Sequence, residues 1–166
     1  MKLVLILIVC CLIIFIFYKA FCYYRSRQYF FENLCEFCES FNSEISFLKN
    51  NLNDILEKQK NCYKKDFNLL LNDYQTALKL KDSFNKHFSK SLDKLAILKQ
   101  DEKDKINMFF SMLGRTNVLD QKSQIASFKQ NFERHKQNAI DETKKYGEMN
   151  IKLGIICAIA VFIIFI

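Results

Sequence analysis

Two cysteines and two histidines are the residues of this 166-residue chain whose chemistry would be most informative. Cys35 and Cys38 have the two-residue separation that is typical of thiol redox sites and of one half of many zinc sites. Both fall on the apolar stripe of an expected helix, and no second cysteine pair or nearby histidine completes a zinc ligand set. We therefore predict that Cys35 and Cys38 are packing residues, with redox or metal chemistry as the alternative. His87 and His135 stand alone in the sequence and indicate no site.

Other catalytic or cofactor-binding patterns are missing from the sequence. Glycine occurs only at Gly114, Gly147 and Gly154, so no glycine-rich loop could hold a phosphate. No histidine pair has metal-binding spacing. We expect a protein that is not an enzyme, with no cofactor and no metal. The seven cysteines are an odd number, and a cytosolic domain would keep its cysteines as thiols.

The elements that would position these residues are helices. Proline is absent and glycine is rare, so the usual residues of tight turns are nearly missing, whereas Leu, Lys, Glu and Gln favour helices. The predicted fold class is all-α: a membrane-anchored antiparallel helical bundle with an apolar transmembrane segment at each end. We assign residues 1–24 to a transmembrane anchor, 25–150 to a cytosolic helical bundle, and 151–166 to a C-terminal transmembrane segment.

The two ends of the chain lack charged residues. None occurs from Leu3 to Tyr18, which is long enough to cross a bilayer once a snorkelling Lys19 and the aromatic residues that follow it are included. A cleaved signal peptide is the alternative, but no small-residue cleavage site follows. The segment from Leu153 to Ile166 is also uncharged and is shorter, so it either spans a thinned bilayer or dips in without crossing.

Charge also predicts the orientation of the chain. Basic residues follow the first apolar segment and precede the second, so the central domain should face the cytosol; these residues are Lys19, Arg25, Arg27, Lys144, Lys145 and Lys152. Apart from Lys2, Lys19 and Lys152, the 25 basic residues lie among the 18 acidic ones and form no strongly basic block, which does not favour nucleic acid. If a basic face is functional, the faces near the membrane are the first to consider, for lipid headgroups or an acidic partner.

Apolar residues recur at helical spacing throughout the central part. The first stripe predicts a helix that continues from the membrane, with a break near Lys49, Asn50 and Asn51; it comprises Phe30, Leu34, Phe37, Phe41, Ile45, Leu48, Leu52 and Ile55. Two further stripes predict either two helices or one helix and its continuation; they comprise Phe67, Leu70, Leu71, Tyr74, Ala77 and Leu78, and then Phe84, Phe88, Leu92, Leu95 and Leu98.

The last two expected helices have recognisable ends. Asp101 is the predicted N-cap of a helix with Ile106, Phe109, Phe110 and Leu113 on its buried face, and Gly114 is its predicted C-terminal cap. Asn117 is the predicted N-cap of a final helix that runs straight into the membrane; its apolar side is predicted to carry Ile125, Phe128, Phe132, Ala139 and Tyr146.

These residues carry a resemblance to a known family. The run Leu113, Gly114, Arg115, Asn117, Gln121, Ile125, Phe128, Phe132, Ala139, Tyr146, Leu153 and Gly154 resembles stage III sporulation protein AB of endospore-forming bacteria, and the first half resembles it more loosely. The chain departs from the family pattern at Lys49–Asn51, where relatives usually have a proline-containing turn. It also has Asn117 where relatives usually have Asp, and Asn still caps a helix. The motif residues we single out are Leu113, Gly114, Arg115, Asn117, Gln121, Ala139, Leu153 and Gly154.

The resemblance implies a non-enzymatic component of the channel complex between mother cell and forespore, needed for endospore formation. It implies a cytosolic domain similar in fold to the platform domain of type II secretion and type IV pilus systems. It also implies an ATPase of the stage III sporulation protein AA type as partner, beside membrane lipid and other channel proteins, in the mother-cell membrane around the forespore. Self-association into a homo-oligomer stays open. The alternatives are a membrane-tethered helical scaffold unrelated to sporulation and a redox or metal protein that uses Cys35 and Cys38.

Overall fold

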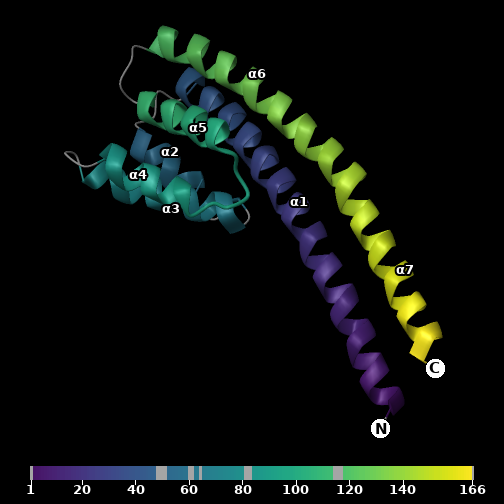
Figure 1. Cartoon of the computed structure of the whole chain (residues 1–166). Coiled ribbons are helices and arrows are strands. Elements are labelled where there is room, and N and C mark those ends of the chain that lie inside the picture. The colour runs from purple at the N-terminus through teal and green to yellow at the C-terminus, as the bar shows by residue number, and fades with distance from the viewer. Residues whose placement is uncertain are drawn as a thin grey trace. The chain divides into compact units, whose positions relative to one another are not determined.

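The computed structural model of the chain describes residues 2–47, 52–59, 62–63, 65–80, 84–113 and 118–165. Within these ranges every regular element is a helix, which confirms the all-α prediction. The elements are α1 (Lys2–Phe47), α2 (Leu52–Gln59), α3 (Lys65–Lys79), α4 (Phe84–Asp93), α5 (Gln100–Met112), α6 (Val118–Glu142), a π-helical turn η2 (Thr143–Gly147) and α7 (Glu148–Phe165) (Figure 1).

The chain divides into two compact units. The terminal unit consists of residues 1–28 and 137–166, and the central unit is Tyr29–Lys136. Helices α1 and α6 contribute residues to both units. The predicted boundaries at residues 24/25 and 150/151 mark membrane limits, which the helices do not test, and they stay predictions.

Helix α1 confirms that the first apolar segment and the first helix of the bundle are continuous, since it has no interruption from Lys2 to Phe47. In the central unit its predicted stripe is buried from Phe30 to Ile45. The expected break at Lys49–Asn51, with Leu48, lies outside the described residues, between the end of α1 and the start of α2. On α2, Ile55 is buried as predicted and Leu52 is half-buried.

Aromatic rings form the core of the central unit, where α2 to α5 gather around the second half of α1 (Figure 1). The fully buried Phe37 of α1 has its ring centre 5.8 Å from that of Phe67 on α3 and 5.7 Å from that of Phe110 on α5. Tyr74 is equally buried and donates its hydroxyl to the carbonyl oxygen of Phe110 at 3.0 Å. Burial of a phenol is tolerated because this bond satisfies its polar group.

The stripe from Phe84 to Leu98 does not form one helix. Helix α4 ends at Asp93, and Leu95 and Leu98 lie in the connection to α5, where backbone hydrogen bonds close two turns, Leu95 N to Leu92 O and Leu98 N to Leu95 O. Leu98 is nevertheless buried. Apolar spacing reports burial, and here burial continues past the end of the helix.

The start of α5 differs from the sequence prediction. Its N-cap is Lys99, and Asp101 is an exposed residue of the first turn, so the prediction that Asp101 is the N-cap is wrong. The carboxylate of Glu102 instead accepts the backbone N–H of Lys99 at 2.9 Å, the reciprocal half of a capping box. This bond satisfies a donor that the helix itself leaves without a partner.

The sequence indicated that His135 stands alone, but in the structure it contacts side chains from two other helices. Its Nδ1 lies 3.3 Å from the Glu102 carboxylate, the two side chains being 15% and 1% exposed. Its ring stacks on Phe31 with centres 5.5 Å apart, and Lys105 Nζ lies 3.4 Å from Nε2. His135 therefore joins the start of α5 to α6 and α1. His87, by contrast, is exposed.

In the terminal unit, α6, η2 and α7 follow one another without a break, which confirms that the last helix runs straight into the apolar C-terminal segment. The first half of α1 and α7 lie side by side (Figure 1). Among the residues that the structure describes, two helices, α1 and the helix that ends at Phe165, are long and apolar enough to cross a membrane. In the terminal unit, the apolar side chains of these two helices are largely exposed.

Candidate functional site

Within the terminal unit, α1 contacts α7 along a seam of small residues. A Cβ atom placed on Gly154 would lie 2.8 Å from Phe17 Cβ, and one placed on Gly147 would lie 3.1 Å from Phe21 Cδ2. Further along, Cys10 Sγ lies 3.4 Å from the carbonyl oxygen of Ala158. Small residues let two helices approach closely in a membrane, where dispersion and hydrogen bonds hold them together.

Polar contacts close this seam at its charged end. Arg27 of α1 donates to the carboxylate of Glu142 on α6, with side chains that are 4% and 26% exposed. In the residue after Glu142, the Thr143 hydroxyl lies 2.8 Å from the carbonyl oxygen of Ala139 and 3.2 Å from that of Tyr24. A buried ion pair is weak evidence for net stability, and this one identifies Arg27 and Glu142 as residues at which α1 and α6 meet.

The π-helical turn η2 lies at the centre of these contacts. Thr143 begins it and Gly147 ends it, and both residues are buried. An extra residue in one turn changes the direction in which later side chains point, and such turns are frequent at functional positions. In this chain, Ala139 and Thr143 before or at the start of the turn and Gly154 and Ala158 after it are all buried.

Tyrosines and lysines lie at the same level of the unit. The ring of Tyr24 stacks on Tyr146 at 6.0 Å, and Lys145 Nζ lies 5.1 Å from the centre of the Tyr146 ring. Tyr23 is exposed and packs edge-on against Tyr24. This combination of tyrosine rings and cations is typical of the interface between hydrocarbon and water. Tyr146 itself is 39% exposed, so it is not on the buried side where the sequence placed it.

The family motif residues serve different parts of the fold. Leu113 and Gln121 are buried in the central unit, at the end of α5 and the start of α6. Ala139 and Gly154 are buried in the terminal unit, whereas Leu153 is 41% exposed. The structure therefore brings Ala139 and Gly154 together on one seam and leaves Leu153 outside it. Gly114, Arg115 and Asn117, with their predicted caps, lie outside the described residues, between the end of α5 and the start of α6 at Val118.

Cys35 and Cys38 are buried on the apolar stripe of α1, where the sequence predicted them. Burial raises the pKa of Cys35 to about 11 and raises the pKa of Cys38 as well, with the neighbouring Cys35 adding to the latter shift. A thiol with a raised pKa is a poor nucleophile and a poor metal ligand at neutral pH. Across the described residues, no group of three or more His, Cys, Asp or Glu side chains is arranged to hold a metal ion.

The sequence did not predict which residues of α1 meet which residues of the run from α6 to α7. Phe17 and Thr143 carry no pattern that singles them out, and Arg27 and Glu142 are 115 residues apart. One signal was present: Gly147 and Gly154 are seven residues apart and Ala158 is four further on, a small-residue spacing that predicts close helix packing.

Comparison with known proteins identifies a family for the chain. The family described as stage III sporulation protein AB matches residues 1–166, which is the whole chain. No curated protein and no solved structure matches the chain.

Proposed function

Because the chain belongs to the stage III sporulation protein AB family, we propose that it is a non-enzymatic membrane component of the secretion-like channel complex between mother cell and forespore. Family membership confirms the resemblance drawn from the sequence and supports a role in sporulation. The channel, the platform role and the ATPase partner are our proposals. The match over the whole chain is the observation that carries them.

Two features of the helices support a platform role. Helix α1 belongs to both units without interruption, as does the run from α6 to α7, so each apolar segment is covalently part of a bundle helix. A platform needs a helical body attached at a membrane and a surface for partners. The central unit supplies the body, since its aromatic core is closed and fully buried.

We propose that the central unit is cytosolic and meets an ATPase of the stage III sporulation protein AA type. Leu69 on α3 and Met108 on α5 are each 62% exposed, and a partner that covered them would gain apolar burial. Single exposed apolar residues are common, so these two serve as probe positions and not as a defined interface.

Deletion of the gene tests the function. We expect the deletion strain to grow normally, to begin engulfment and to produce no heat-resistant spores, with recovery when the full chain is supplied in the mother cell. A growth defect in cells that never sporulate would support the alternative, a helical scaffold unrelated to sporulation. An unaltered spore count would contradict the proposed function.

Photo-crosslinking in sporulating cells tests the partner. Crosslinking amino acids at Leu69 and Met108 should capture the ATPase, and the matched control at Ile163 on the apolar α7 should not. Capture from all three positions would show non-specific association. Capture of other proteins without the ATPase would contradict direct binding and leave the sporulation role in place.

The alternative of a redox or metal protein has its own test. Replacing Cys35 and Cys38 together by Ala removes both thiols, and we expect full sporulation if the variant accumulates to normal levels. Loss of sporulation by a folded variant would favour thiol chemistry. The raised pKa values and burial of the two thiols are the observations against that alternative.

A further inference from the structure

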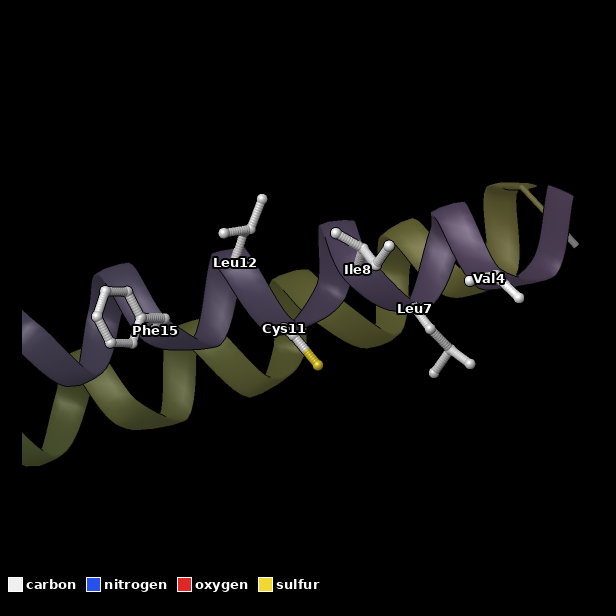
Figure 2. A pocket seen from close by; sticks show the side chains of 6 residues that line it. All are labelled: Val4, Leu7, Ile8, Cys11, Leu12 and Phe15. Atoms are coloured by element: carbon white, nitrogen blue, oxygen red, sulfur yellow. The ribbon is translucent and has the colours of Figure 1, made fainter. Parts of the chain in front are cut away.

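A shallow apolar groove, open to the surroundings, runs along one face of α1 in the terminal unit. It has a volume of about 550 Å³ and is lined by Val4, Leu7, Ile8, Cys11, Leu12 and Phe15 (Figure 2). From Val4 to Phe15 the helix rises about 16 Å, close to the thickness of one leaflet of the hydrocarbon core, about 15 Å. The contacts to α7 come from other residues of α1, among them Cys10 and Phe17, so the groove is not part of the seam.

A cation lies at one end of this groove. Lys19 is exposed, and its Nζ lies 5.4 Å from the centre of the ring of Phe15, the lining residue nearest to Lys19 in the sequence. Lysine extends a charged group from apolar surroundings toward the polar zone of a membrane. The groove therefore combines an apolar floor of leaflet length with a positive charge at its end.

Further cations lie at neighbouring levels of the unit. Because Phe17 packs against Gly154 and Phe21 against Gly147, residue 19 is level with the stretch between those glycines. Lys152 lies in that stretch, and Lys144 and Lys145 lie just before it; all three are exposed. Glu148 is the only acidic residue in the sequence of residues 17–26 and 143–154, so the field at this level is positive.

We propose that α1 carries a binding site for one anionic phospholipid. An acyl chain lies in the groove from Val4 to Phe15, and the headgroup phosphate is held by Lys19 within the positive field of Lys144, Lys145 and Lys152. The apolar lining selects a lipid chain and the cations select an anionic headgroup, because a basic residue near an anionic membrane surface contributes about 1 kcal/mol. The inference rests on the proposed membrane anchoring of the terminal unit.

Native mass spectrometry of the full-length protein tests this site. The purified chain in mild detergent is titrated with phosphatidylglycerol or with phosphatidylcholine of the same acyl chains, and the bound lipid is counted. We expect one retained phosphatidylglycerol per chain and weaker retention of phosphatidylcholine. Lys19→Gln should lower phosphatidylglycerol affinity about 5-fold, the factor that corresponds to one basic residue. Lys90→Gln, an exposed lysine of the central unit, is the matched control.

A second pair of variants tests the groove. Cys11→Trp fills it and should abolish retention of both lipids, whereas Cys157→Trp, which enlarges an exposed cysteine on α7, should leave retention unchanged. Equal binding of the two lipids by the natural sequence, or full retention in Cys11→Trp, would overturn the proposal. So would a disulfide between Cys11 residues of two copies formed in oxidised membranes, since it would show that a second chain covers the groove.

Failure of this inference and failure of the proposed function give different results. If alkaline carbonate extracted the chain from membranes, the proposed membrane anchoring of the terminal unit would be contradicted. A chain that stays in the membrane and supports sporulation, but binds both lipids alike, would contradict the lipid site alone.

Discussion

At the scale of single residues, Arg27 of α1 and Glu142 of α6 form an ion pair between the two ends of the chain. The guanidinium is almost fully buried and the carboxylate is about three-quarters buried, so water compensates neither charge completely. In such a pair the cost of desolvation is close to the attraction gained, and the loss of one partner removes a counterion from the other charge. The pair marks a position at which α1 and α6 meet.

Removal of one charge should be worse than removal of both. We expect Glu142→Gln to lower the free energy of unfolding by on the order of 3 kcal/mol, because Arg27 stays buried beside a neutral amide. Arg27→Met with Glu142→Leu should recover most of this loss. Chemical denaturation of the detergent-solubilised chain measures both. If the double variant were as unstable as the sum of its single variants, the pair would not act as one unit.

The buried thiols of α1 predict a loss of stability at high pH. Unfolded cysteines release their protons from an ordinary pKa of 9.0, whereas folded Cys35 holds its proton to about pH 11. Between these values the folded state binds more protons, so stability is unaffected below about pH 9 and falls as the pH rises toward 11. Cys35→Ala with Cys38→Ala should make this fall shallower.

Thermal unfolding from pH 7 to pH 10.5 measures the slope for the natural sequence and the double variant. Cys62→Ala is the matched control, because Cys62 is an exposed cysteine of the same unit. A slope that was equal in all three proteins would show that the buried thiols do not contribute to it.

At the scale of elements, the pairing of α1 with α7 depends on the absence of side chains at two glycines. The atom nearest to a Cβ on Gly154 is Phe17 Cβ, which is attached to the backbone and cannot move aside. The atom nearest to a Cβ on Gly147 is at the edge of the Phe21 ring, which can rotate. The same substitution should therefore have unequal effects at the two positions.

We expect Gly154→Ala to destabilise the helix pair by about 1–3 kcal/mol, the usual cost of overpacking, and Gly147→Ala to cost less. Thermal unfolding of the full chain in one detergent gives the order of the two variants. Ala160→Val, at an exposed position of α7, is the control for added volume without a facing helix. Equal melting temperatures for all three variants would contradict the close packing at Gly154.

Most elements could be predicted from the sequence, because apolar side chains at helical spacing are those that become buried. The ends of elements were less predictable. Asp101 is a favourable cap residue by type, yet Lys99 is the cap because the buried Glu102 binds its N–H and His135 at the same time. That choice depends on α6, which lies about 30 residues further along the chain, and no local pattern reports it.

At the scale of the whole molecule, charge and helix continuity predict one topology. Cys62 is an exposed residue of the central unit. If both apolar segments span the membrane and the central unit is cytosolic, a reagent outside the cell should not reach it. We expect a membrane-impermeant maleimide to label Cys62 in inverted vesicles and not in intact protoplasts. Lys2→Cys should show the reverse. Labelling of Cys62 in protoplasts would contradict the orientation.

The candidate site was predictable in part. The sequence placed Ala139 and Gly154 in a family pattern and placed the cations beside the apolar ends, because composition changes abruptly there. The sequence did not predict that Phe17 and Thr143 face the opposite helix. Such contacts join residues that are far apart in the chain and depend on how closely the two helix backbones approach each other. A spacing of small residues indicates that a helix is approached closely and does not indicate by which side chain.

The π-helical turn from Thr143 to Gly147 has a consequence for chain length. Deletion of one residue within this turn would remove its extra residue and leave an ordinary α-helical turn. Deletion of one residue between Gly147 and Gly154 would instead rotate everything after it by about 100°, the advance of an α-helix per residue. Gly154 would then no longer face Phe17, although every other residue of α7 would be unchanged. Between Gly147 and Gly154 the number of residues is therefore itself part of the structure, because both glycines face α1.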